Sequence, residues 1–159
     1  MQLEYIFFDF DGVFTDNFVY TSTDGIESVK TSRSDSFALS QWKLNPRTEH
    51  IKIFIISSEK DNVVEKRADK LGIPSYIGVE SKDLLIEEIF RKDGNSQTDF
   101  KNAWLRSIFV GNDLNDLPAM KKAKFAFCPA DANLGVKDIA SKVFEKRGGD
   151  GFVREVLEY

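Results

Sequence analysis

The sequence predicts an α/β fold built on a parallel sheet, and three observations predict it. Short apolar runs alternate along the chain with segments of helical period, which is the pattern of strand–helix–strand units. Several of these runs show no alternation of apolar and polar residues, as in strands buried on both faces of a sheet. Four of them end abruptly in polar residues, as expected where strands of an open parallel sheet face a ligand.

The first strand is predicted at residues 5–8, and the rest of the chain is organised around the residues that follow it. Asp9, Asp11 and Gly12 come directly after this apolar run. Gly12 permits a sharp turn of the backbone. Two carboxylates at one strand end repel each other unless a cation or a shared proton lies between them. This stretch is therefore a candidate ligand site, although a lone Asp-x-Asp is more often an ordinary polar turn.

A hairpin and a helix are predicted next. Asp24-Gly25 between two partly β-branched runs predicts a hairpin over residues 17–30, within a flap of about 13–31. Ser34-Asp35 predicts the N-terminal cap of a helix that ends at Asn45-Pro46. The apolar residues expected along this helix are Phe37, Leu39, Trp42 and Leu44.

The remaining elements follow from apolar runs, helical spacing and flanking Ser or Gly residues. In chain order we expect a strand at 51–56, a helix at 61–71, a short strand at 75–77, a helix capped by Ser81 and ended by Gly94, a weakly structured polar segment at 95–102, a strand at 107–110, a helix at 117–122, a strand at 125–127 and a final helix at 153–157.

Length and composition exclude several classes of protein. A chain of 159 residues is expected to form one domain over residues 1–159. The net charge of −4 does not favour a nucleic-acid partner. A single cysteine, Cys128, and a single histidine, His50, leave no internal disulfide and argue against a zinc site. The apolar runs are too short to span a membrane. Because the first strand begins near residue 1, we expect no signal peptide and a cytoplasmic location.

Polar residues follow four of the predicted strands, and each group has an ordinary explanation. A serine can cap a helix, a lysine is usually a solvated surface residue, and an Asn/Asp run is often a turn. All four groups are nevertheless expected at the same edge of one sheet, where open α/β sheets bind ligands. They are Asp9 with Asp11, then Ser57, then Lys82, and finally Asn112, Asp113 and Asp116.

These residue types together suit phosphoryl transfer. Carboxylate oxygens are preferred ligands of Mg²⁺, and a carboxylate can also attack phosphorus to form an aspartyl-phosphate. A hydroxyl and a lysine can hold the oxygens that are not transferred. A second carboxylate can protonate the leaving alkoxide and then activate water.

The pattern resembles the haloacid dehalogenase (HAD) superfamily of phosphatases. The resemblance is carried by residues 9–16, by Ser57 after its strand, by Lys82 and by the segment 111–116. The tail 145–155, together with residues 33–36 and 59–71, resembles the sugar-acid phosphatase branch. This branch includes phosphatases of 3-deoxy-octulosonate 8-phosphate and of 2-keto-3-deoxy-nononate 9-phosphate, and the related domain attached to some acylneuraminate cytidylyltransferases. The resemblance covers nearly the whole chain and implies a Rossmannoid parallel sheet with helices on both faces.

The resemblance also implies catalytic roles. Asp9 corresponds to the nucleophile, and Asp11 corresponds to the general acid/base, with its backbone carbonyl as a metal ligand. Ser57 and Lys82 correspond to the residues that bind the phosphate. The implied cofactor is Mg²⁺.

The chain departs from the family pattern at the third metal ligand. The family usually has Asp directly after the motif glycine, where this chain has Asn112. An amide oxygen can bind Mg²⁺ but carries no charge, so weaker metal binding is expected. Asp113 is an alternative ligand, and Asp116 is expected behind the ligands.

Neither long gap between the motifs has room for a cap domain, so the site is expected to be open. The branch that the chain resembles forms tetramers, in which a neighbouring subunit helps to close each site. We therefore expect a homotetramer closed by the hairpin and by the tail 148–154. Phe14, Phe18 and Tyr20 are expected to be exposed apolar residues that a neighbour covers.

The helix after Ser57 carries candidate substrate-binding residues. Arg67 and Lys70 lie three residues apart and suit a carboxylate, while Ser58 and Glu59 are placed to meet sugar hydroxyls. Charged residues at this spacing are usually a solvated face, and only the resemblance favours a role in binding. It implies a 2-keto-3-deoxy sugar acid phosphate as the small-molecule substrate, and Glu59 favours the nine-carbon acid.

Two other functions were weighed against the phosphatase. A catalytically silent assembly module, partnering a cytidylyltransferase, stays open because of Asn112, although such a module has no need of Asp9, Asp11, Ser57 and Lys82 together. A phospho-receiver domain is discounted, because its phosphoacceptor Asp would stand where the second strand here ends in serine.

Overall fold

The computed structural model describes residues 2–60 and 62–159, and its centre is a six-stranded sheet. All neighbouring strands of this sheet pair in parallel. In sheet order the strands are β5 (Ser75–Tyr76), β4 (Lys52–Ile56), β1 (Tyr5–Phe8), β6 (Ser107–Val110), β7 (Phe125–Cys128) and β8 (Lys142–Val143). The chain winds outward from β1 through β4 to β5 and then returns to β6, so the strand order reverses beside β1. Ligands bind at such a reversal in doubly wound sheets.

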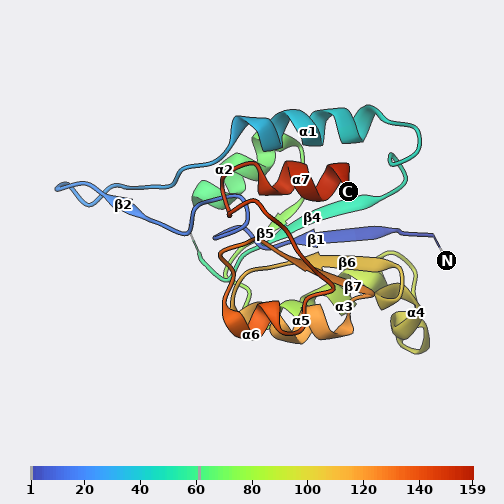
Figure 1. The fold of residues 1–159 in the computed structure, drawn as a ribbon. Helices are drawn as coiled ribbons and strands as arrows, with labels where there is room; N and C mark the ends of the chain where they lie inside the picture. Colours follow the sequence, from blue (N-terminus) through green and yellow to red (C-terminus); the bar gives the residue numbers. More distant parts are fainter. Residues whose placement is uncertain (1, 61) are drawn as a thin grey trace.

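Helices cover both faces of the sheet, as predicted (Figure 1). One core cluster lies under α1 (Arg33–Leu44), α2 (Asn62–Leu71) and α7 (Phe152–Glu158). The other lies under α3 (Lys82–Lys92), α4 (Phe100–Trp104), α5 (Leu117–Lys122) and α6 (Leu134–Lys137). Alternate residues of β1 enter opposite clusters, with Ile6 and Phe8 in the first and Tyr5 and Phe7 in the second. This confirms that the apolar run of β1 is buried on both faces.

The predicted hairpin is present and extends from the carboxyl-end edge of the sheet (Figure 1). Its strands, β2 (Tyr20–Thr21) and β3 (Glu27–Ser28), pair antiparallel. Phe18 is exposed to 64% and Tyr20 to 52%. The expectation that Phe14 is exposed is wrong, because its ring stacks on Phe10 at 5.7 Å and packs edge-on against a second ring in the core. The described residues include no cap domain, and none of their helices is long and apolar enough to cross a membrane.

Several short elements were not predicted. Residues 95–102, expected to be weakly structured, contain a 3₁₀ helix (Gln97–Asp99) that leads into α4. Phe100 and Trp104 of α4 bury their rings against Phe90. Two apolar residues in so short a helix are too few to show a helical period in the sequence. Helix α6 and strand β8 are shorter still. The helix predicted at 61–71 is present from Asn62, and residue 61 lies outside the described residues.

Helix α1 begins one residue earlier than its predicted cap. The Ser32 hydroxyl accepts the backbone N–H of Ser34 at 3.2 Å, so Ser32 is the N-cap. Of the apolar residues predicted along α1, Leu39 is buried and Trp42 packs against the core, whereas Phe37 and Leu44 are exposed. At α3, Ser81 occupies the N-cap position as predicted, but its side chain makes no capping hydrogen bond.

Asp35, predicted as part of the α1 cap, instead joins α1 to the last helix. Its side chain is buried, and Oδ1 accepts the backbone N–H of Arg154 in the first turn of α7 at 2.9 Å. It therefore satisfies a helix N-terminus that has no side-chain cap of its own. Burial raises the pKa of this carboxyl to about 6, while the Arg154 N–H and the Arg67 charge oppose the shift.

Replacing Asp35 by Asn should remove a pH dependence of stability. A folded-state pKa of about 6, above the usual value of 3.8, means that the folded protein loses stability as pH rises from about 4 to 6. Asn keeps an acceptor for Arg154 and carries no charge. Relative to Asp35→Asn, the wild type should lose up to about 3 kcal/mol of unfolding free energy across this window, measured by urea unfolding at several pH values.

The exposed Asp69, on α2, provides a matched control. Asp69→Asn should follow the wild-type pH profile. If Asp35→Asn also follows it, the buried carboxyl is not the source of the dependence.

Candidate active site

The polar groups predicted at four strand ends come together at the carboxyl edge of the sheet. They surround a hollow of about 140 Å³, called here the acidic hollow. Its lining residues are Asp9, Asp11, Asn17, Ser57, Ser58, Glu59, Asn112, Asp113 and Asn115. Lys82 and Asp116 lie beneath it and are almost completely buried. The predicted clustering of polar groups at this edge is therefore confirmed in space.

Lys82 connects two buried carboxylates. Its Nζ lies 2.6 Å from Asp9 Oδ1 and 2.6 Å from Asp116 Oδ1. Only 2% of Lys82 is exposed, so it is not a surface lysine. Burial works to lower its pKa, but the two carboxylates outweigh burial and raise it. Burial and the charge of Asp116 raise the pKa of Asp9 to about 7, against the opposing effect of Lys82. Because one cation lies between two carboxylates, one negative charge is left without a partner. Asp9 therefore favours a second positive charge nearby.

Asp116 also fixes the loop after β6. Its Oδ2 accepts the backbone N–H groups of Asn112 at 2.9 Å and Asp113 at 3.2 Å. A Cβ on Gly111 would lie 2.5 Å from the same oxygen, so glycine is required for this approach. The carboxylate of Asp116 is therefore fully used inside the protein, with one oxygen on Lys82 and the other on the loop.

Asn112 contacts both aspartates of the first loop. One terminal atom of its carboxamide lies 3.0 Å from Asp9 Oδ2 and 2.8 Å from the carbonyl oxygen of Asp11. When that atom is the nitrogen, it donates a hydrogen bond to each oxygen. When it is the oxygen, three oxygens face one another, an arrangement that requires a cation between them. Adjacent oxygens around an octahedral Mg²⁺ are about 2.9 Å apart, so these three fit that ion.

The alternative ligand, Asp113, is oriented differently. Its Oδ1 accepts the N–H of Leu114 at 2.7 Å and caps the 3₁₀ helix Leu114–Asp116. The described residues contain no group of three or more His, Cys, Asp or Glu side chains placed to hold a metal. The fit to a cation therefore depends on the carbonyl of Asp11 and on the Asn112 amide.

Close backbone packing shapes the first loop. Gly12 has φ +78°, and a Cβ there would lie 1.9 Å from the Asn112 amide. The Thr15 hydroxyl accepts the N–H groups of Gly12 at 3.1 Å and Asn17 at 3.2 Å. From behind, the C-terminal tail approaches so closely that a Cβ on Gly148 would lie 2.0 Å from the Gly12 carbonyl. The glycine-rich tail is thus a packing element of this loop within its own chain.

Three polar residues of this site were not assigned by sequence reasoning. Thr15 lies inside the aspartate motif, yet its hydrogen bonds depend on the turn geometry. Asn115 lies inside the second motif and donates to Ser58 Oγ at 3.0 Å. Asn17 had no signal beyond its position at the start of the hairpin.

Arg67 and Lys70 do not reach the acidic hollow within one chain. Arg67 donates to the Ser32 carbonyl at 3.3 Å and to the Ser36 hydroxyl. Both residues line a different hollow, between α1 and α2. Ser58 and Glu59, by contrast, do line the acidic hollow. A role for Arg67 and Lys70 at the site of a neighbouring subunit stays a prediction.

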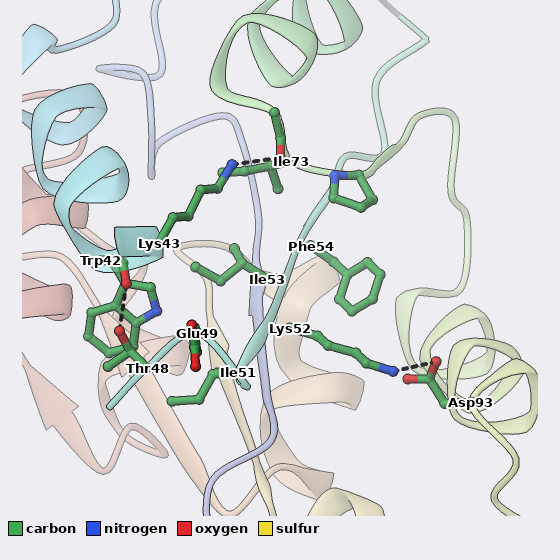
Figure 2. A pocket seen from close by; sticks show the side chains of 12 residues that line it. Trp42, Lys43, Thr48, Glu49, Ile51, Lys52, Ile53, Phe54, Ile73 and Asp93 are labelled. Atoms are coloured by element: carbon green, nitrogen blue, oxygen red, sulfur yellow. Dashed lines mark hydrogen bonds and ion pairs between the residues drawn. The ribbon is translucent and has the colours of Figure 1, made fainter. Parts of the chain in front are cut away.

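A larger hollow, of about 480 Å³, lies at the opposite end of the sheet, near the start of β4 (Figure 2). Two lysines on its rim already have partners. Lys43 donates to the carbonyls of Leu71 and Gly72, and Lys52 pairs with Asp93 at 2.7 Å. None of the predicted catalytic residues lines this hollow, so size does not identify the active site here.

Comparisons with known proteins agree with this geometry. No protein-family model matches the chain. A 3-deoxy-D-manno-octulosonate 8-phosphate phosphatase from Salmonella typhi is 28% identical over 158 residues, which are 99% of this chain and 78% of the relative. A HAD family hydrolase from Streptomyces avermitilis is 32% identical, with a TM-score of 0.87 over 99% of this chain and 84% of that one.

A third relative carries ligands. The crystal structure of 3-deoxy-D-manno-octulosonate 8-phosphate phosphatase from Moraxella catarrhalis, a complex with magnesium, phosphate and a KDO molecule, is 25% identical. Its TM-score is 0.85 over 98% of this chain and 84% of that one. The chain therefore belongs to the HAD family of hydrolases.

Proposed function

We propose that this chain is a Mg²⁺-dependent phosphatase that hydrolyses the phosphate ester of a 2-keto-3-deoxy sugar acid. The observation that carries the proposal is Lys82, held between Asp9 and Asp116 directly beneath the acidic hollow. A buried cation beside a carboxylate at the carboxyl edge of the sheet suits phosphoryl transfer. This reaction needs a nucleophile and a positive charge near the phosphoryl oxygens.

Three oxygens would hold the metal. They are a carboxylate oxygen of Asp9, the backbone carbonyl of Asp11 and the amide oxygen of Asn112, with Asp113 as the alternative to Asn112. When bound, Mg²⁺ supplies positive charge to the phosphoryl oxygens. The magnesium and phosphate in the Moraxella relative support this assignment.

The residues of the chain would then act in two steps. A carboxylate oxygen of Asp9 attacks phosphorus, the ester P–O bond breaks, and Asp11 protonates the departing alkoxide. Asp11 next takes a proton from water as the water attacks the aspartyl-phosphate, which releases inorganic phosphate and restores Asp9. Ser57 and Lys82 hold the oxygens that are not transferred.

The acid with eight carbons is supported by the relatives, which are phosphatases of 3-deoxy-D-manno-octulosonate 8-phosphate. The preference for the nine-carbon acid rests on Glu59 alone, whose side chain lines the acidic hollow. The carboxylate would be met by Arg67 and Lys70 of a neighbouring subunit in a homotetramer. The single cysteine of the chain, Cys128, is buried and suits a reducing cytoplasm.

A catalytically silent assembly module is the second candidate, and Asn112 is the feature that favours it. An amide that donates to both aspartates leaves the site satisfied without a metal. The full set of Asp9, Asp11, Ser57 and Lys82 at one hollow weighs against this reading.

Asp9→Asn should abolish phosphate release and leave the fold intact, because the Lys82–Asp116 pair remains. Asp11→Asn should lower kcat by about 10²–10⁴-fold, the usual loss for a general acid/base. The assay measures phosphate release from the eight-carbon acid, the nine-carbon acid and a neutral hexose phosphate. Asp69→Asn, far from the hollow, serves as the control.

Near wild-type turnover by Asp9→Asn would contradict the mechanism. Equal kcat/KM for the neutral sugar phosphate and for the acids would contradict carboxylate recognition, while the proposal of phosphatase activity would be unaffected. No release from any substrate by the wild type would favour the assembly module.

Asn112→Asp should tighten Mg²⁺ binding, since it adds a charge and removes two hydrogen bonds that compete with the metal. We expect at least about a tenfold lower Kd, measured by titrating activity and by calorimetry. Without metal the variant should unfold more easily, because a second carboxylate oxygen then faces Asp9 Oδ2 and the backbone carbonyl of Asp11.

Asn115→Asp is the matched control, since it adds the same charge to the same hollow through a side chain that contacts Ser58 instead. If both variants tighten Mg²⁺ equally, general charge explains the effect. If neither does, Asp113 or another group already supplies the charge.

The exposed hairpin should be covered by other copies of the chain. Phe18 and Ile26 lie just outside the two strands of the hairpin and are each exposed to 64%. An isolated pair of such short strands is marginal alone in water. Light scattering at micromolar concentration should give the mass of a tetramer, and Phe18→Asp should reduce it. A monomer mass for the wild type would contradict the proposed assembly.

A further inference from the structure

Asn17 has an unusual backbone conformation at the edge of the active site. Its φ is +65°, and no other described residue apart from glycine has a positive φ. The conformation is held by the bond from its N–H to the Thr15 hydroxyl at 3.2 Å, in the turn that also carries Asp11. Asn17 therefore sits where the catalytic loop turns into the hairpin.

The conformation explains why Asn is better here than most residues, but not why it is better than Gly. Glycine adopts a positive φ without cost, whereas asparagine tolerates this region better than most residues but less well than glycine. The carboxamide of Asn17 is exposed, and no hydrogen bond to it from the described part of the chain offsets this disadvantage. An exposed carboxamide without a hydrogen bond from the described residues, at a position that suits glycine better, indicates contact with a ligand.

The carboxamide lies between two hollows. One is the acidic hollow, and the other, of about 180 Å³, lies between the hairpin and α2 and is called here the flap hollow. Asp11, Asn17 and Glu59 line both, so the two hollows adjoin at these three residues. A substrate whose phosphate lies in the first can extend its carbon chain into the second.

The flap hollow has a distinct chemistry. Its lining residues are Phe10, Asp11, Asn17, Val19, Glu27, Val29, Glu59, Val63 and Val64. Among these, Asn17 alone has a side-chain N–H donor, since the other polar side chains are carboxylates, which only accept. An anionic group entering this hollow meets carboxylates and no cation. A hydroxyl group suits it, because a hydroxyl can donate to Glu27 or Glu59 and accept from Asn17.

We propose that Asn17 is a specificity-determining residue whose carboxamide donates a hydrogen bond to a hydroxyl on the substrate carbons nearest the phosphate. The flap hollow then binds the hydroxylated chain, and the carboxylate of the substrate lies outside it. This inference rests on the proposed phosphatase function, and it assigns the ligand chemistry of the hollow beside that site.

Asn17→Gly tests the proposal, because glycine keeps the backbone conformation and removes only the carboxamide. Phosphate release is measured for 3-deoxy-octulosonate 8-phosphate and for an aryl phosphate, which has no hydroxyls on its leaving group. Loss of one neutral hydrogen bond should lower kcat/KM for the sugar acid phosphate by about tenfold, mainly through KM. The aryl phosphate should be unaffected, and the melting temperature should not fall.

Asn17→Asp is the second variant, since it preserves the shape of the side chain and removes the donor. Its kcat/KM for the sugar acid phosphate should stay below that of the wild type. A Gly variant that loses activity equally on both substrates would show a structural role for the loop and overturn the proposal. An unchanged kcat/KM for the sugar acid phosphate would overturn it as well.

Calorimetry separates this inference from the proposed function. The unphosphorylated sugar acid should bind more weakly to Asn17→Gly than to the wild type. If the wild type releases phosphate from no substrate, the phosphatase proposal fails, while this binding difference still supports Asn17 as a ligand contact. Equal binding of the sugar acid by both proteins overturns the Asn17 assignment whatever the outcome for catalysis.

Discussion

The ion pairs that Lys82 makes with Asp9 and Asp116 are the interaction on which the rest of the site depends. They join the end of β1, the start of α3 and the loop after β6, three segments far apart in sequence. Burying charges is costly, but removing one partner of a buried pair costs still more, about 3–5 kcal/mol, because the remaining charge is left unpaired. The same contacts that position Asp9, the proposed nucleophile, therefore also hold the strand ends together.

Glycines are as important to this site as charged residues. Gly12 lets Asn112 approach the first loop, Gly111 lets Asp116 lie against the second, and Gly148 lets the tail pack behind the first. In each case a methyl group would lie 1.9–2.5 Å from its neighbour. The three glycines thus allow close contact with the Asn112 and Asp116 side chains and with the backbone of the first loop. Such a site is shaped by rigid loops, and the order in those loops comes from Thr15 and Asp116.

Sequence reasoning recovered the sheet and the polar edge because both depend on local patterns. Unbroken apolar runs identify β1, β4 and β6, and polar residues directly after a strand must lie at its carboxyl end. The burial of Lys82 was not predictable in this way, since it depends on two carboxylates from other strands. A binding role for Arg67 rests on the resemblance, because its spacing on α2 does not show which way the side chain points. Within one chain it donates to Ser32 and Ser36, at the start of α1. Asp35 was taken for a local cap, and its partner proved to be 119 residues away.

Asn112 gives this site its individual character. The Asn112 carboxamide can satisfy the oxygens of Asp9 and Asp11 by itself, so the chain folds around a closed set of hydrogen bonds without needing a cation. Binding a metal then requires that amide to turn its oxygen inward, which gives up two hydrogen bonds in exchange for coordination. An aspartate there would leave three oxygens in mutual contact without metal. On the proposed mechanism, the uncharged ligand Asn112 means weaker metal binding, so activity should follow the cation concentration more closely than it would at a site with two charged ligands.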